Sequence, residues 1–301
     1  MTAEQTMMLP GVLAESVRPR RRIRVKTLFT VGPCLLLVIV FVGVGLFAPA
    51  LAPQDPKKVE LIHKLEPPAW QQGGSWDHAL GTDNLGRDVL SRLIHGTRVS
   101  LLVVALTVPL SVLWGVTVGL LAAWYSGLTD KVLMRIVDVQ LAMPAILFAI
   151  LLAAVFGPSL RNVVILIVVW GWSGYARVIR GETLSLRERD YVLGARSAGA
   201  TDFRILTRHL LPNLVNSIVI LATLEIASVI LIEASLSFLG VGVAPGTASW
   251  GAMVAEGRTF ITIAWWLITI PGIAIFTVSL VANFMGDWLR DALDPRLKNI
   301  R

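Results

Sequence analysis

The chain has 301 residues, of which 55% are hydrophobic and only 16% are charged, and its formal net charge is +7. A soluble domain carries about a quarter charged residues. This composition, together with several apolar runs of about 20 residues, favours a polytopic helical membrane protein. The runs are continuous rather than alternating, which argues against a membrane β-barrel. The basic balance would suggest nucleic-acid binding in a soluble protein, but here we expect it to orient the chain in a membrane, with no nucleic-acid partner.

The hydropathy pattern predicts an all-α fold with six transmembrane helices. The fourth is the weakest, because its apolar run is the shortest. The expected helices are residues 28–51, 99–124, 136–157, 161–177, 214–237 and 263–286.

The distribution of Lys and Arg predicts that both termini are cytoplasmic. The tail 1–27 and the alternate connections on its side of the membrane carry 19 of these residues, and the connections on the other side carry 8. Positive charge accumulates in cytoplasmic loops. The tail and first run also have the order of parts of a secretory signal, but a signal's apolar region is usually about 7–15 residues. We therefore expect an uncleaved first span, followed by an extracytoplasmic segment 52–98.

Several kinds of active site are disfavoured by the residues. No lysine follows a glycine, so the chain lacks the P-loop that would bind ATP. Ser173, in the sequence GWSG, resembles a membrane protease nucleophile, but no predicted span contains a histidine to act as its base. The histidines of the outer segment, His63, His78 and His95, are 15 and 17 residues apart and lack the close spacing of zinc ligands. We expect no catalytic, cofactor or metal site.

Three acidic residues lie within or at the edge of predicted spans: Asp138, Glu225 and Glu233. An ionisable group at that depth usually faces a cavity or a partner. Glu225 and Glu233, eight residues apart on one helix, could relay protons or bind a cation, which would make the chain an ion-coupled transporter or channel. Alternatively they form polar packing contacts. Glu233 is expected near the outer end of its helix, where water is available.

The stretch LGARSAGATDFRILTRHLLPN, residues 193–213, interrupts the apolar runs on the expected cytoplasmic side. Its small residues predict a smooth helix face that another backbone can approach closely. Gly199 can break the helix with a positive φ, and Thr201 or Asp202 can cap a second short helix. Pro212 suits the first turn of the next span. The apolar side of the second short helix is expected to consist of Phe203, Ile205, Leu206 and Leu210.

This stretch resembles the cytoplasmic coupling loop of ABC importer permeases. The family pattern is Glu-Ala-Ala, three residues, Gly, nine residues, and Ile-x-Leu-Pro. The matching positions here are the triplet 193–195, Gly199 and the segment 209–212, with the same spacing. Leu193, Gly194 and His209 replace the family's Glu, Ala and Ile. The missing glutamate puts in doubt a carboxylate contact at position 193.

Three further stretches, 78–101, 233–258 and 286–298, are similar to permeases of dipeptide, oligopeptide and nickel importers, in particular to the C-type subunit of the pair. The resemblance implies a type I importer permease fold. We divide the chain accordingly into the tail 1–27, a first helix 28–51, the outer segment 52–98, a five-helix core 99–287 with the coupling loop at 185–213, and the C-terminus 288–301.

The resemblance also implies the partners and the division of labour. A second permease of the B type would complete the translocation path. Two cytoplasmic P-loop ATPases would bind ATP and receive the coupling loops, and an extracytoplasmic binding protein would deliver substrate, most plausibly di- or oligopeptides. The chain itself would be a non-catalytic subunit in the bacterial inner membrane, in contact with lipid.

The candidate site residues follow from the resemblance and the charge pattern. ATPase coupling is assigned to Leu193, Gly194, Ala195, Arg196, Gly199 and Asp202. For Arg196, Arg204 and Arg208, pairing with ATPase acids or with anionic lipid remains open. Asp83, Arg87 and Asp88 form a charged cluster before the second span. They either fix the outer loop or contact the binding protein.

Overall fold

The computed structural model describes residues 25–293, and side chains from residue 32 onwards. Over this range the secondary structure is helical, apart from one isolated bridge between Thr82 and Asp88. The basic tail is outside the described residues except for its last three positions, and so is the C-terminus from residue 294. The expected all-α class is confirmed for the described part of the chain.

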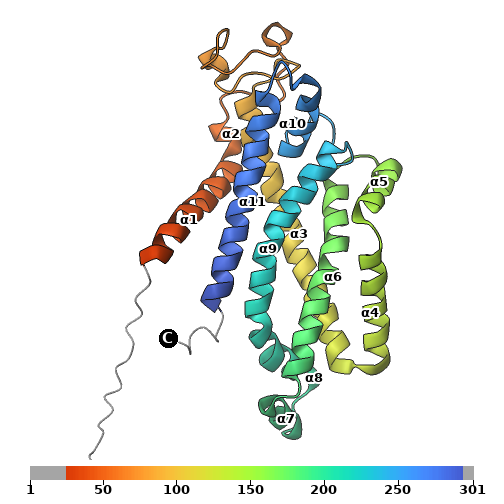
Figure 1. The fold of residues 1–301 in the computed structure, drawn as a ribbon. Helices are drawn as coiled ribbons and strands as arrows, with labels where there is room; N and C mark the ends of the chain where they lie inside the picture. Colours follow the sequence, from red (N-terminus) through yellow and green to blue (C-terminus); the bar gives the residue numbers. More distant parts are fainter. Residues whose placement is uncertain (1–24, 294–301) are drawn as a thin grey trace, which may run out of the picture.

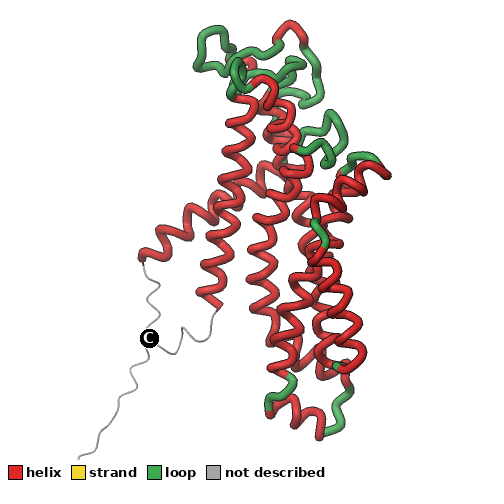
Figure 2. Tube along the Cα trace, turned by 45° about the vertical axis from the view of Figure 1, so that its right-hand side comes forward, coloured by secondary structure: helices red, strands yellow, loops and turns green. Residues whose placement is uncertain are grey.

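The helices follow one another along the chain in an elongated bundle (Figure 1). The short α7 and α8 lie at one end, called here the α7 end, and α10 lies towards the other, the α10 end. Loops collect at these two ends (Figure 2). The α-helices are α1 Val25–Leu46, α2 Ala48–Leu51, α3 Val89–Tyr125, α4 Gly127–Ala142, α5 Ala145–Phe156, α6 Leu160–Leu186, α7 Asp190–Ser197, α8 Asp202–Ile205, α9 Leu211–Phe238, α10 Trp250–Gly257 and α11 Trp266–Leu293.

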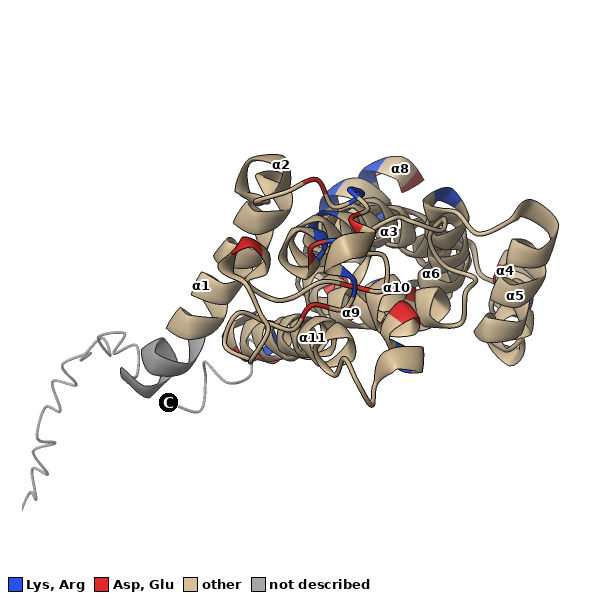
Figure 3. Cartoon of the chain, turned by 90° about the horizontal axis from the view of Figure 1, so that it is seen from above, with Lys and Arg blue, Asp and Glu red and all other residues tan. Residues whose placement is uncertain are grey.

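Four helices are long and apolar enough to cross a membrane: α3, α6, the continuous unit of α8 and α9 (Asp202–Phe238), and α11. If the bent pair of α4 and α5 counts as one span, the described residues contain up to five candidate spans. Within α1, Gly32–Leu46 is a shorter apolar helix. Seen from above, α1 and the α4–α5 pair lie at opposite sides of the bundle (Figure 3). The four long helices therefore form the centre of the bundle, with the shorter apolar helix α1 on one side and the bent α4–α5 pair on the other.

The expected single helix 136–157 is wrong. The chain bends by 83° between α4 and α5, and Met143 and Pro144 separate the two helices in extended conformations. Proline has no N–H to continue a helix and disfavours helical geometry in the residue before it. The apolar run gave no sign of this bend, because hydropathy is unchanged across it.

Other boundaries also differ from the sequence prediction. The second span begins at Val89 rather than 99, because Asp88 caps it by accepting a hydrogen bond from the Ser91 N–H at 2.7 Å. The last ten residues assigned to the outer segment are therefore helical. Helix α6 continues to Leu186, nine residues beyond the predicted end, and α11 begins at Trp266 rather than 263. Helix ends are set by capping and backbone hydrogen bonds rather than by hydropathy, so they fall either beyond the apolar run, as in α3 and α6, or within it, as at the start of α11.

Helices α3 and α6 cross closely because α3 is smooth where they meet. A side chain at Gly115 would place its Cβ 2.4 Å from the Trp172 carbonyl oxygen, and one at Gly119 would meet the Ala176 carbonyl oxygen at 2.7 Å. Small residues four positions apart allow such backbone approach in membrane helices. Ser173, on α6, is fully buried and donates to the Trp170 carbonyl at 2.9 Å. This fits the packing role rather than that of a nucleophile.

Candidate functional site

The segment 185–213, which resembles a coupling loop in sequence, forms a helix–glycine–helix knob at the α7 end of the bundle (Figure 1). Helix α7 ends at Ser197, and Gly199 turns the chain with φ of +78°. Thr201, rather than Asp202, is the N-cap of α8, and its side chain accepts from the Arg204 N–H. A π-turn over Leu206–Leu210 then leads into α9, which has Pro212 in its first turn. The knob therefore has the local structure expected from the sequence.

The knob is fixed to the bundle by its own apolar side chains. Val192 from α7 and Ile205 and Leu210 from the α8 side are at most 1% exposed, and they pack with Ile179 and Leu214 of the long helices. Leu206 is half-buried beside them. This packing connects the knob to α6 through Ile179 and to α9 through Leu214.

The outward surface of the knob is open and carries exposed apolar side chains beside charged ones. Phe203, which was predicted on the apolar side of the second short helix, is 76% exposed, and Leu193 is 48% exposed. A Cβ built at Gly194 or at Gly199 meets no atom within 4 Å. Ala195 is half-buried and Asp202 is exposed. The bundle does not fill the space in front of these small residues, so a partner backbone can approach there.

Arg196 differs from the other polar residues of the knob because it turns back to the bundle. Its guanidinium lies 5.7 Å from the centre of the Trp124 ring on α3. A cation over an indole face is attracted by the ring's negative surface. Arg204 and Arg208 are exposed. Arg196 therefore has an intramolecular contact that sequence reasoning, which considered ATPase acids and lipid, did not foresee.

Glu225 faces a cavity of about 480 Å³ between α5, α6 and α9. Tyr175 on α6 donates a hydrogen bond to Glu225 Oε2 at 2.5 Å. Gly171, one turn before Tyr175, makes room for the carboxylate, because a Cβ there would lie 2.4 Å from Glu225 Oε1. The rest of the lining is mostly apolar. Sequence reasoning identified Glu225 but missed Tyr175 and Gly171, although their four-residue spacing would have placed them on one helix face.

Glu233 was expected near water, and this expectation is wrong, because its side chain is only 1% exposed. Ser237 donates to its Oε1 at 2.9 Å. The chain after α9 folds back over it so tightly that a Cβ at Gly242 would meet Ser237 Oγ at 2.1 Å, and one at Gly251 would meet Ala234 Cα at 2.6 Å. The two glycines let this segment cover the carboxylate.

Asp138, the third acid of the spans, lies on the surface of α4. Its Oδ1 is 2.6 Å from Arg177 Nη2 on α6, and both side chains are 57% exposed. An exposed pair of this kind contributes little to stability. Neither Asp138 nor Arg177 lines the cavity at Glu225, so Asp138 is a surface ion-pair residue rather than part of the Glu225 site.

An outer network of charged residues consists of Asp83 and Arg87 before α3, Arg92 in the first turn of α3 and Glu256 on α10. The first three are buried, and Glu256 is half-buried. Asp83 Oδ2 accepts from Arg87 Nε at 2.6 Å and also from Arg92. Glu256 on α10 accepts from Arg87 at 2.8 Å and from Arg92 at 2.7 Å. Asp88 is buried too, but caps α3 instead. Sequence reasoning found the first two residues and missed Arg92 and Glu256, because the latter is more than 160 residues away.

Comparisons with known proteins are consistent with this geometry. The model of the family "binding-protein-dependent transport system inner membrane component" matches residues 115–299. The di/tripeptide transport system permease protein DppC of Pseudomonas aeruginosa is 44% identical over 265 residues, 88% of each chain. The glutathione transport system permease protein GsiD of Pectobacterium atrosepticum is 40% identical over 297 residues, 97% of this chain and 96% of its own.

A solved structure also resembles the fold. A chain of the MetNI methionine ABC transporter in an inward-facing conformation superposes with a TM-score of 0.54, covering 67% of this chain and 96% of its own. The sequences are only 17% identical, so the likeness concerns the fold. It places the described helices in the type I ABC importer permease architecture.

Proposed function

Because the chain belongs to the family of binding-protein-dependent transport system inner membrane components, we propose that it is one of two membrane subunits of an ABC importer for small peptides. It is a multi-pass inner membrane protein and a transport component. In this proposal it shares a translocation path with a B-type permease, and an extracytoplasmic binding protein supplies the substrate. The chemistry of ATP hydrolysis belongs to separate ATPase subunits.

The observation that carries the proposal is the knob formed by α7, Gly199 and α8. It combines an internal apolar anchor with an unfilled outer surface carrying Phe203 and Leu193. An ATPase groove that receives this surface can push or pull the knob, and the anchor passes the movement to α6 and α9. This arrangement supports the assignment of Leu193, Gly194, Ala195, Gly199 and Asp202 to ATPase docking. The α7 end, and with it both termini, would then face the cytoplasm.

The substrate class is proposed from the relatives, whose names specify di/tripeptides and glutathione. The cavity between α5, α6 and α9 is a suitable part of the translocation path. Its wall is mostly apolar, and the hydrogen-bonded pair of Glu225 and the Tyr175 hydroxyl provides polar groups that a peptide can contact. A permease that handles varied peptides gains from a mostly apolar wall, which makes few side-chain-specific contacts. Selection among peptides would fall to the binding protein.

The alternative of an ion-coupled transporter is not favoured. It would require Glu225 and Glu233 to share a pathway, whereas Glu225 faces the cavity and Glu233 is covered by the segment that follows α9. Family membership also points to transport systems with several components.

The test is affinity purification of the tagged chain from its native membrane in mild detergent, followed by mass spectrometry and reconstitution into liposomes. We expect a second permease and P-loop ATPases to copurify, and a labelled dipeptide to accumulate only with ATP and the binding protein. Uptake that needs a proton gradient and no ATPase would overturn the proposal.

A further inference from the structure

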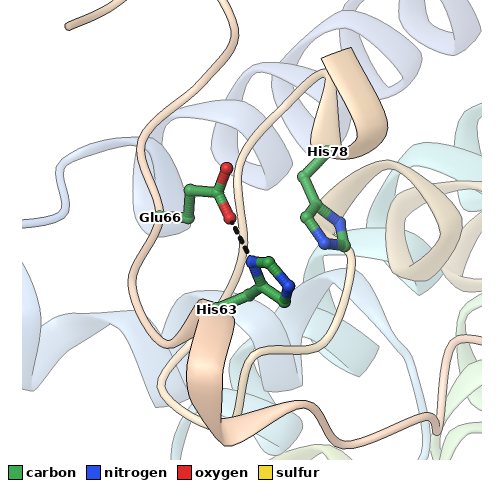
Figure 4. Close-up of side chains that lie close together, drawn as sticks. All are labelled: His63, Glu66 and His78. Carbon is green, nitrogen blue, oxygen red and sulfur yellow. Dashed lines mark hydrogen bonds and ion pairs between the residues drawn. The ribbon is translucent and has the colours of Figure 1, made fainter. Parts of the chain in front are cut away.

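Three side chains of the outer segment converge although they are separated in sequence (Figure 4). His63 ends a short 3-10 helix, Leu61–His63, and His78 ends another, Trp76–His78. Glu66 lies between them in the chain. One ligand atom from each of the three residues lies within 4.8 Å of the other two, and the two imidazole rings are 5.4 Å apart between centroids. Two imidazoles and one carboxylate are a donor set that suits Zn²⁺.

The orientation of His78 suits a metal ligand. Its side chain is 3% exposed, and its Nδ1 lies 3.3 Å from Asp88 Oδ1. Asp88 is itself held in place, because its other oxygen caps α3 at Ser91. Ligating histidines commonly use one ring nitrogen for a carboxylate and the other for the metal. With Nδ1 engaged in this way, Nε2 is left for the cluster.

The backbone that carries His63 and Glu66 is held by Thr82. The Thr82 hydroxyl contacts the His63 carbonyl and accepts a hydrogen bond from the Glu66 N–H at 2.8 Å, while the Thr82 N–H donates to the Glu66 carbonyl at 2.9 Å. Leu65, between the two ligands, has a positive φ of 55° and donates its N–H to the Asp83 carbonyl at 3.0 Å. These contacts fix the backbone positions of His63 and Glu66 before any ligand binds.

The electrostatics of the cluster favour a cation. Besides Glu66, the carboxylates of Glu60 and Asp88 lie near His78, with Glu60 Oε2 4.0 Å from its Nε2. Lys58 pairs with Glu60 at 2.5 Å. Among the described residues, Lys58 is the only lysine or arginine that forms an ion pair with Glu60, Glu66 or Asp88.

We propose that His63, Glu66 and His78 bind a divalent transition metal ion of the zinc type and so cross-link the outer segment. Ligand atoms around a tetrahedral zinc are about 3.4 Å apart, as follows from metal–ligand distances near 2.0–2.1 Å. His63 must therefore move towards His78 and exchange its 2.9 Å hydrogen bond to Glu66 for the metal. It is free to do so, because its side chain is 49% exposed. Water occupies the fourth position on this exposed side.

Sequence reasoning expected no metal ligands here, because the histidines are 15 residues apart. The spacing rule applies to ligands on one turn or one short loop. In this chain Thr82 and Asp88, which lie beyond both histidines, bring the two loops together. The site thus depends on tertiary contacts that cannot be predicted from the number of residues between the two histidines.

The test uses the full chain, purified with a tag that contains no histidine and treated with a chelator. Zinc chloride is then titrated, with magnesium chloride as the comparison cation, and bound metal is measured by elemental analysis. We expect one zinc ion per chain, no retained magnesium, and a rise in the thermal unfolding midpoint with zinc alone. His63→Ala should weaken zinc binding at least about tenfold, as loss of a ligand requires, and should abolish the zinc-dependent rise.

His63→Ala is the informative variant because His63 is exposed and its removal should leave the metal-free unfolding midpoint unchanged. Glu66→Gln should also weaken binding. His95→Ala is the matched control: His95 lies in the same region, with its Nδ1 beside the Ser91 carbonyl and outside the cluster, and the variant should bind zinc as the wild type does. Equal zinc content in wild type and His63→Ala, or none in the wild type, would overturn the proposal.

Discussion

The two ends of the bundle differ in which side chains they bury: the α10 end buries charged side chains, whereas the α7 end exposes apolar ones. At the α10 end, Asp83, Arg87 and Arg92 are buried and pair with one another and with Glu256. At the α7 end, Phe203 and Leu193 are exposed, and the space before Gly194 and Gly199 is unfilled. The first end is closed by its own contacts, while the second leaves surface for another protein. Changes at the outer network should therefore affect folding, and changes at the knob should affect coupling.

The largest effect is expected from Arg92→Ala. The substitution leaves Asp83 and Glu256 with fewer positive partners in a buried setting, and breaking a buried pair costs about 3–5 kcal/mol. We expect a large loss of folded protein and a lower unfolding midpoint in detergent. Arg98→Ala, an exposed arginine on the same helix, is the control and should behave as wild type. Normal folding of Arg92→Ala would show that the α10 end is not held by its charges.

Gly199→Val should have the next largest effect, and a different one. Valine is strained at a φ of +78° by about 1–3 kcal/mol, which will change the angle between α7 and α8. We expect normal membrane insertion but at least about a tenfold loss of ATP-driven peptide uptake in liposomes. Gly246→Val imposes the same strain at φ of +81° in the segment between α9 and α10, also in open space, and should keep ATPase coupling. Full transport by Gly199→Val would count against the knob as the coupling element.

Phe203→Ala tests the docking surface with less disturbance. The ring is 76% exposed, so its loss should leave the unfolding midpoint unchanged. If it fills a pocket on the ATPase, affinity should fall by roughly tenfold or more, as for an interface anchor. The measurement is copurified ATPase per permease. Phe156→Ala, at the end of α5 with 70% exposure, should retain the ATPase. Equal retention in both variants would remove Phe203 from the interface.

The smallest effect is expected from Glu225→Gln. The amide can still accept the hydrogen bond from Tyr175, and an ATP-driven path needs no proton carrier at this position. Uptake should change by no more than a few-fold and should remain insensitive to a protonophore. Complete loss of uptake by a stable variant would favour the ion-coupled alternative, because it would show that transport requires the Glu225 carboxylate.

The sequence by itself determined the class of the protein and the form of the knob. Both are local properties: hydropathy over about 20 residues predicts helices in a membrane, and Gly199 with Thr201 predicts a break followed by a cap. The departure at Pro144 was also local, but the continuous apolar run concealed it. Local conformation within one loop, such as the positive φ at Gly199 and the cap at Thr201, was therefore accessible to sequence reasoning.

Only the tertiary structure decided which distant residues meet. The contact of Arg92 with Glu256 spans 164 residues, that of Tyr175 with Glu225 spans 50, and the approach of His63 to His78 depends on Thr82 and Asp88. It also decided that Glu233 is covered while Phe203 is exposed. The physical reason is that burial and pairing depend on which segments pack together in space, whereas periodicity and spacing report only on residues that are neighbours in the chain.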